Sequence, residues 1–220
     1  MAKASEEEHH FRVVQCNEPL PSKRKRKTRG GASSVGAEVT KRQPFPFSSS
    51  KVFHHYRVVP GAQWSRLQSY RCFLFQGTQF RLGDFVRVAN RLTSQDNPTE
   101  HAVKDLKRPE RDWIAHILEI RAADHYHVFA RVYWMYWPED IPKRVMQDLT
   151  RIRGPEIFHR SHEVIASNHM DIIDVMSVNG LETVKPMRSS RRDARSSQLF
   201  WKESFDCFQK TISGNVGSKE

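Results

Sequence analysis

Residues 112–140 contain the pattern that most restricts how this chain can fold. Two runs rich in β-branched and aromatic residues, Trp113–Ile120 and Val128–Trp137, flank a short polar break at Asp124–His127. Such a pattern predicts two adjacent strands joined by a turn. Pro138 has no N–H to donate to a sheet, so the second strand should end before it. Because side chains alternate between the two faces of a strand, one face of the second run should carry Val128, Ala130, Val132, Trp134 and Tyr136.

Three aromatic residues of this region are candidates for a binding site. Trp134 and Tyr136 are two residues apart, which places them roughly 7 Å apart on one face of a strand. Rings at that separation can form two walls of a box for a methylated ammonium group, with about 0.5–2 kcal/mol of cation–π attraction for each good contact. Trp113 on the neighbouring strand can supply a third wall. The alternative is that all three rings are ordinary sheet core.

Three segments in order resemble the bromo-adjacent homology (BAH) domain family. The segment Trp-Met-Tyr-Trp-Pro-Glu-Asp (134–140) is similar to a strand-end motif of that family, an aromatic pair followed by Pro-Glu and a further acid. Residues 162–171 are similar to its Glu-x-x-x-Ser-x-His-x-Asp segment, and Phe80–Val88 to its opening Gly-Asp-x-Val strand. The resemblance covers roughly residues 64–206.

The resemblance implies a mainly β fold, a twisted and partly closed antiparallel sheet with long loops. The resemblance also implies that the protein recognises a histone tail or nucleosome and acts in gene silencing. Within the family, the sequence is most similar to fungal readers of the Polycomb-type trimethyl-lysine mark. Carried over, the methyl-lysine cage is Trp113, Trp134 and Tyr136, and the peptide groove is formed by His169 and Asp171. The family more often has Tyr where Trp113 stands, so the size limit of the cage is an open point.

Purely structural roles are the alternative for the two groove residues. His169 can be a half-buried histidine with its hydrogen bonds satisfied, and Asp171 can cap a turn before a strand at Ile172–Val178. The broader rival is a BAH scaffold that binds proteins or nucleosome surfaces without reading methyl-lysine.

Residues 1–50 are expected to be a disordered basic arm, because large apolar residues are few and Ser, Gly, Pro, Lys and Arg are common. Within them, five consecutive basic residues predict a nuclear localisation signal, with a merely solvated charge run as the alternative. These residues are Lys23, Arg24, Lys25, Arg26 and Lys27. We expect the domain itself over residues 51–212, a disordered tail over 213–220, and location in the nucleus.

The positive charge is concentrated outside the expected domain. Of the net +11, residues 1–50 contribute +5 and residues 185–198 contribute +4, which leaves +2 for the remainder. A nearly balanced domain does not suggest nucleic-acid binding through its own surface. The arm can still add nonspecific, salt-sensitive attraction to DNA, and a DNA-tethering protein with a passive domain is a second rival.

Local patterns predict several further elements. We expect strands over 70–75 and 80–88 around a turn at 76–78, with Gly83 marking a bulge or a close backbone approach. A helical turn is expected at Lys143–Leu149 and a tight turn at Asn179-Gly180. Residues 199–206 fit either a helical stripe or a strand, and the family resemblance favours the strand.

Several function classes lack support in the sequence. There is no Gly-rich phosphate loop, nucleophile elbow or His-Glu-x-x-His motif, so we expect no enzyme and no cofactor. The three cysteines are far apart and the histidines lack partners at ligand spacing, so we expect no metal site. No apolar run approaches the ~20 residues that span a bilayer, so no membrane is expected as a partner. The resemblance implies histone tails, nucleosomes and other chromatin proteins as partners, and the basic arm can add nonspecific contact with DNA.

Overall fold

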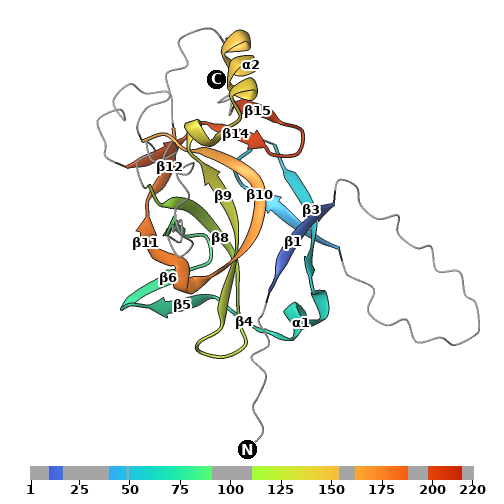
Figure 1. Ribbon diagram of the computed structural model, residues 1–220, viewed down its shortest axis with the longest axis vertical. Coiled ribbons are helices and arrows are strands. Elements are labelled where there is room, and N and C mark those ends of the chain that lie inside the picture. The colour runs from blue at the N-terminus through green and yellow to red at the C-terminus, as the bar shows by residue number, and fades with distance from the viewer. Residues whose placement is uncertain are drawn as a thin grey trace, which may run out of the picture.

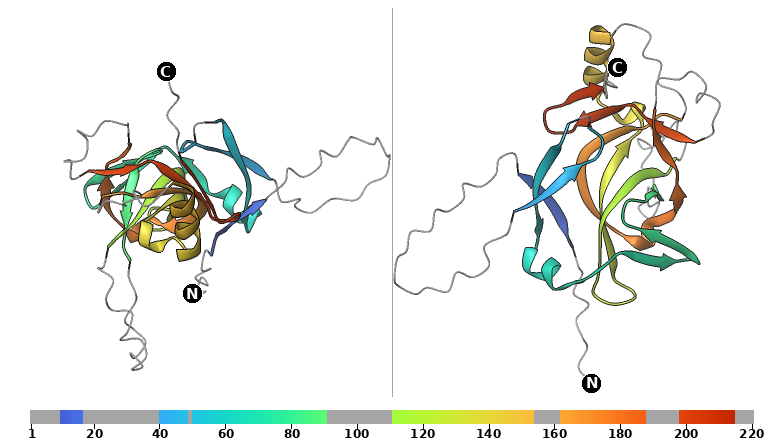
Figure 2. Two further views of the ribbon diagram at one scale, coloured as in Figure 1. Left: turned by 90° about the horizontal axis from the view of Figure 1, so that it is seen from above. Right: turned by 180° about the vertical axis from the view of Figure 1, so that it is seen from behind.

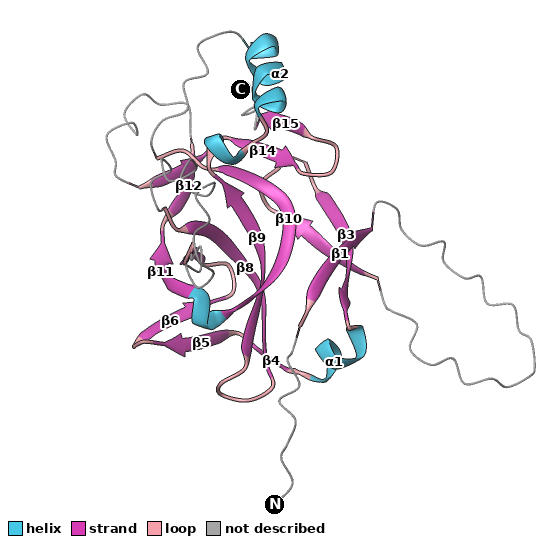
Figure 3. Ribbon diagram, viewed as in Figure 1, coloured by secondary structure: helices cyan, strands magenta, loops and turns pink. Residues whose placement is uncertain are grey.

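A computed structural model describes residues 10–16, 40–48, 50–90, 111–153, 162–187 and 198–214. The described residues form a mainly β structure with two short α-helices, as Figure 3 shows. The predicted fold class, mainly β with antiparallel sheets that do not close into a barrel, is confirmed. No helix in the described segments is long and apolar enough to cross a membrane.

The predicted central hairpin is the middle of the largest sheet. It consists of β8 (Trp113–Ala122) and β9 (Val128–Tyr136), and β9 ends before Pro138 as predicted. The sheet runs in the order β11-β7-β8-β9-β10-β14-β15, and β4 pairs with the far end of β8. The other members are β4 (Gln68–Tyr70), β7 (Phe85–Val88), β10 (Ile165–Asp174), β11 (Val178–Glu182), β14 (Glu203–Asp206) and β15 (Thr211–Gly214).

The strand alternation in β9 is confirmed by its burial on both faces. On one face Phe129, Tyr133 and Met135 join a large core cluster, which also contains residues of a second sheet. On the other face Ala130 and Val132 join a cluster with residues of β6 (Thr78–Arg81) and β7. The central strands are therefore covered on both sides, which explains their nearly continuous apolar sequence.

The N-terminal region contains the largest departure from the sequence-based expectation. Residues 12–16 and 41–45, expected to be disordered, form β1 (Arg12–Cys16) and β2 (Lys41–Phe45) on either side of β3 (Val52–Val59). Phe11, Phe45 and Phe47 are buried in the core. The fold therefore begins well before residue 51, because tertiary burial of these aromatic side chains outweighs a polar local composition. The predicted localisation signal at 23–27 lies outside the described residues.

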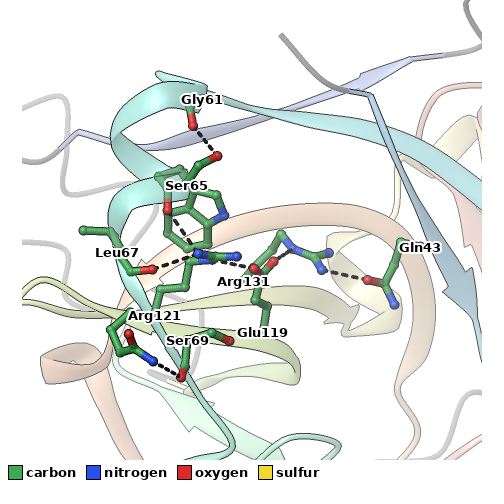
Figure 4. A network of polar contacts seen from close by, with 10 residues as sticks. Gln43, Gly61, Ser65, Leu67, Ser69, Glu119, Arg121 and Arg131 are labelled. Carbon is green, nitrogen blue, oxygen red and sulfur yellow. Dashed lines mark hydrogen bonds and ion pairs between the residues drawn. The ribbon is translucent and has the colours of Figure 1, made fainter.

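The three-stranded β1-β3-β2 sheet lies beside the main sheet in all three views (Figures 1 and 2). A buried ion network joins the two sheets (Figure 4). Glu119 Oε1 accepts from Arg121 at 2.6 Å, and its Oε2 accepts from Arg131 at 3.0 Å. Arg131 also donates to Gln43 of β2 at 2.7 Å, and its guanidinium lies 4.2 Å from the ring centre of Tyr56 in β3.

Smaller elements complete the fold. Residues 72–75 form β5 (Cys72–Phe75), which pairs with β6 in a hairpin as predicted. The single strand predicted over 80–88 is wrong, because it is interrupted at residues 82–84 and its second part, β7, pairs with β8 in the main sheet. Residues 184–186 and 199–201 form the parallel pair β12 (Val184–Pro186) and β13 (Leu199–Trp201). The helices are α1 (Gly61–Arg66) and α2 (Lys143–Arg153), the second of which confirms the expected helical turn. The preference for strands over residues 199–206 is confirmed by β13 and β14.

Several local predictions need correction. Asn179-Gly180 is not a tight turn but lies within β11, where pairing with β7 outweighs the local turn signal. The expected strand at Ile172–Val178 is interrupted by a 3-10 turn, η3 (Val175–Ser177), and β15 extends into the expected tail as far as Gly214. Gly83 has φ of 89°, a conformation that favours glycine, and its N–H donates to Ile117 O of β8 at 2.9 Å. A Cβ at this position would meet no atom within 4 Å, so the backbone conformation, and not the predicted close approach, accounts for the glycine.

Candidate functional site

Trp113 and Trp134 lie on the same face of the β8–β9 hairpin. The register places Trp134 opposite Ala115, which is two residues from Trp113 along β8. Because Ala115 is small, both indoles fit over this part of the sheet. Their ring centroids are 6.0 Å apart and the planes meet at 64°, so the two rings form adjoining walls rather than a stack. Both side chains are half-buried at the edge of an apolar cluster.

Tyr136 shares this face of β9 but makes its ring contacts with different elements. Its ring lies 6.1 Å from His169 of β10 and 5.7 Å from Phe205 of β14, in each case between ring centroids. Its hydroxyl lies 2.8 Å from His169 Nδ1. The structure thus joins Trp113 to Trp134 and Tyr136 to His169, and the phenol belongs to a separate apolar cluster with Ile165 and Phe205.

A bulge in β10 determines where His169 lies. The pairing between β9 and β10 shifts register between Ala166 and Met170. Ser167, which is fully buried, donates from Oγ to Trp134 O at 2.8 Å and accepts from the His169 N–H at 3.2 Å. The bulge therefore rests on one hydroxyl that connects the backbone of Trp134 to that of His169.

Asn168 anchors the same bulge to both ends of the described chain. Its backbone carbonyl accepts from Gln15 Nε2 of β1 at 2.7 Å. Its side-chain oxygen accepts from the Cys207 N–H, after β14, at 2.9 Å. Ser167 and Asn168 were not predicted as site residues, although two buried polar side chains inside an apolar strand are a recognisable signal of such a role.

Asp171 lies on the indole side of the site. Its Oδ2 accepts from Trp134 Nε1 at 3.4 Å, a long contact, and its Oδ1 accepts from the Ile172 N–H at 2.8 Å. The turn-capping role considered for Asp171 belongs instead to Asp174, which accepts from the Met176 N–H at 2.8 Å. Asp171 is therefore a half-buried carboxylate beside the two tryptophans.

The electrostatics of the site favour a cation over an anion. The pKa of Tyr136 is raised to about 12, mainly by burial and to a smaller extent by Cys207, Asp140 and Asp171. Burial lowers the pKa of His169, and Asp171 opposes that shift only in part. Tyr136 and His169 are thus both neutral near pH 7, and the carboxylates supply the local charge.

The described residues contain no group of three His, Cys, Asp or Glu side chains that can hold a metal ion. All three cysteines are free, and burial raises the pKa of Cys207 to about 11, so its thiol is protonated near neutral pH. The arrangement is suited to holding a cationic or extended ligand against aromatic faces.

The likenesses found by comparison with known proteins are to solved structures. No protein-family model and no curated protein matches the sequence. The crystal structure of the yeast Rsc2 BAH domain superposes with a TM-score of 0.44 and 10% identity, and the match covers 67% of this chain and 54% of that one. The match thus spans about half the length of the yeast chain.

Proposed function

We propose that this protein is a nuclear, non-enzymatic chromatin-binding module of the BAH type that binds a histone tail through a methylated lysine. The three sequence motifs described above support the BAH assignment, and the basic run Lys23–Lys27 supports nuclear import. Gene silencing, the fungal affiliation and the trimethylated Polycomb-type mark rest on the same resemblance.

The observation that carries the proposal is the pair of indoles at 6.0 Å with a carboxylate beside them. Two adjoining aromatic faces attract a quaternary ammonium by cation–π contact, and each good contact contributes about 0.5–2 kcal/mol. Asp171, whose Oδ2 lies 3.4 Å from Trp134 Nε1, adds a negative charge next to these faces. Tyr136 would complete the cage from the adjoining position on β9.

The bulge beside the cage supports the proposed groove. His169 is presented by the bulge next to Tyr136, and Asp171 follows two residues later in β10. An extended peptide passing these residues can form main-chain hydrogen bonds while the methylated lysine enters the cage, which is the usual division between affinity and specificity in strand-like recognition.

The test is a calorimetric titration of the full chain with matched histone-tail peptides, unmethylated and trimethylated. We expect one trimethylated peptide to bind about tenfold or more tightly, equivalent to ~1.4 kcal/mol, and Trp134→Ala to abolish the difference. Tyr126→Ala is the matched control, because Tyr126 is an aromatic residue that is 71% exposed in the turn between β8 and β9. Equal binding of all peptides would refute the methyl-lysine proposal.

One observation favours the scaffold alternative. The Tyr136 hydroxyl and ring are both engaged, by His169 and by Phe205, as expected of a core residue. If the module is a scaffold for protein–protein or nucleosome binding, nucleosomes should bind regardless of methylation, and Trp134→Ala should not change their affinity.

A further inference from the structure

Among the described residues, positive charge is concentrated in the N-terminal part of the fold. Residues 10–16, 40–48 and 50–83 contain eight Lys or Arg and no Asp or Glu. The described residues from 84 onward contain eleven Lys or Arg and thirteen Asp or Glu. The folded part of the chain is therefore not evenly balanced, because its N-terminal third carries +8 and the rest carries −2.

Part of this positive charge lies on one face of the β1-β3-β2 sheet. Tyr56 and Val58 of β3 point into the core, so the alternate residues of β3 point away from it. The register of the sheet places Arg42 opposite His55, and Arg12 opposite Val59, on this outer face. We call it the outer face of the small sheet. Its cationic residues are Arg12, Arg42 and Arg57, and the exposed Lys51 directly precedes β3.

The three strands of the small sheet lie to one side of the main sheet (Figure 2). Arg12, Arg42 and Lys51 are exposed, and Arg57 is half-buried. The segment from Lys51 to Val59 is roughly 25 Å long at ~3.3 Å per residue, a length over which one DNA strand presents about seven phosphates. The cations are thus distributed along a stripe rather than gathered at a point.

One cation of the stripe is held in place before any ligand binds. The Arg42 guanidinium lies 4.2 Å from the ring centre of Phe53, which is 41% exposed on the same face. This contact spreads the guanidinium over the sheet and reduces the side-chain entropy lost on binding. An exposed aromatic residue beside arginine is also a common feature of nucleic-acid-binding surfaces.

We propose that the outer face of the small sheet binds the phosphate backbone of nucleic acid, independently of base sequence and of the methyl-lysine site. The complementary charge is the reason for this assignment. Three outward-facing arginines, with Lys51 directly before β3 and no acid on the three strands, attract a polyanion and repel a basic histone tail. The carboxylates near Tyr136 have the opposite preference. One module can thereby contact DNA and a histone tail through separate surfaces.

The parent protein for the test is the full chain with Lys23–Lys27 changed to Gln, so that the basic run does not contribute to DNA binding. Two variants of this parent, each with three further substitutions, are compared with it. The first carries Arg12→Gln, Arg42→Gln and Lys51→Gln. The control carries Lys143→Gln, Arg144→Gln and Lys185→Gln, which removes the same charge from exposed positions on α2 and β12. Fluorescence anisotropy with a labelled duplex DNA measures affinity from ~50 to ~200 mM salt.

We expect the first variant to bind DNA about tenfold or more weakly at the lowest salt and to reduce the slope of log affinity against log salt by about 3. The control should match the parent, and thermal melting should show that both variants are folded. A single-stranded DNA and an RNA of equal length then distinguish which nucleic acid is preferred. The proposal is overturned if both variants lose affinity equally, or if the first weakens binding to anionic lipid vesicles and not to nucleic acid.

Discussion

The phenol oxygen of Tyr136 lies 2.8 Å from Nδ1 of His169, and this contact joins β9 to the bulge of β10. Tyr136→Phe removes the hydroxyl and retains the ring. We expect a loss of about 1 kcal/mol in the free energy of unfolding, since a half-buried imidazole nitrogen loses its partner. Methyl-lysine binding should fall much less than in Tyr136→Ala, because the aromatic wall remains. Equal losses in the two variants, measured by calorimetry, would show that the hydroxyl and not the ring matters.

The N-terminal strands should be essential for folding. A chain beginning at residue 51 lacks β1, β2 and the buried side chains of Phe45 and Phe47, so it should fail to unfold cooperatively in a circular dichroism melt. A chain beginning at residue 10 should melt like the full protein. The single change Phe47→Ala should cost about 3–5 kcal/mol, because this 4%-exposed ring contacts Phe45 and Trp201. Cooperative melting of the chain from residue 51 would contradict this account.

Stability should decrease in mild acid because of a buried histidine. Burial lowers the pKa of His116 to about 4 from 6.5, and Asp84 opposes the shift. Between these values the unfolded chain binds a proton that the native state does not. Stability is therefore fully present above pH ~6.5 and falls, by up to ~3 kcal/mol, as the pH drops to ~4.

The histidine responsible can be identified by substitution. His116→Phe should flatten the pH dependence of the melting temperature, since a neutral ring can keep the contacts with Phe47 and Phe85. The exposed His125→Gln should leave it unchanged. Identical pH profiles for His116→Phe and the parent would assign the acid sensitivity to other groups, such as His54 and His169, whose pKa values burial also lowers.

The buried ion network should be far more sensitive than an exposed ion pair. Arg131 is 3% exposed, and Arg131→Met leaves Glu119 and Gln43 without one of their donors. We expect a cost of about 3–5 kcal/mol in urea unfolding. Arg111→Met removes a pair at 3.5 Å between exposed side chains and should cost less than ~1 kcal/mol. Adding Glu119→Gln to Arg131→Met should recover part of the loss, and similar costs for the two arginines would contradict the role of burial.

Local sequence pattern was sufficient to predict the central hairpin and insufficient to predict the small sheet. In β9 a nearly continuous apolar sequence coincides with burial on both faces, so the local pattern and the tertiary structure agree. In β2 the sequence Lys-Arg-Gln-Pro-Phe has no such pattern, and it forms a strand because Gln43 bonds Arg131 and Phe45 enters the core. The tight turn predicted at Asn179-Gly180 was wrong for the same reason, because the pairing of β11 with β7 involves residues distant in sequence.

The sequence predicted which residues belong to the candidate site, but not which of them contact one another. Strand periodicity placed Trp134 and Tyr136 on one face of β9, and in the structure they pack against two different apolar clusters. It gave no indication that Tyr136 would contact His169, because that contact depends on the register shift in β10. Parallel pairing of β10 with β14 likewise depends on a partner distant in sequence. Whether the cage binds methyl-lysine stays a prediction.

The two anchors of Asn168 have a consequence for the order of events during synthesis. The residue receives one hydrogen bond from Gln15, 153 positions earlier, and one from Cys207, 39 positions later. The β8–β9 hairpin can form as soon as its own residues leave the ribosome, since its contacts are local. The bulge that presents His169 is complete only when residue 207 has emerged. A nascent chain that stops short of that point would carry both tryptophans without a finished groove beside them.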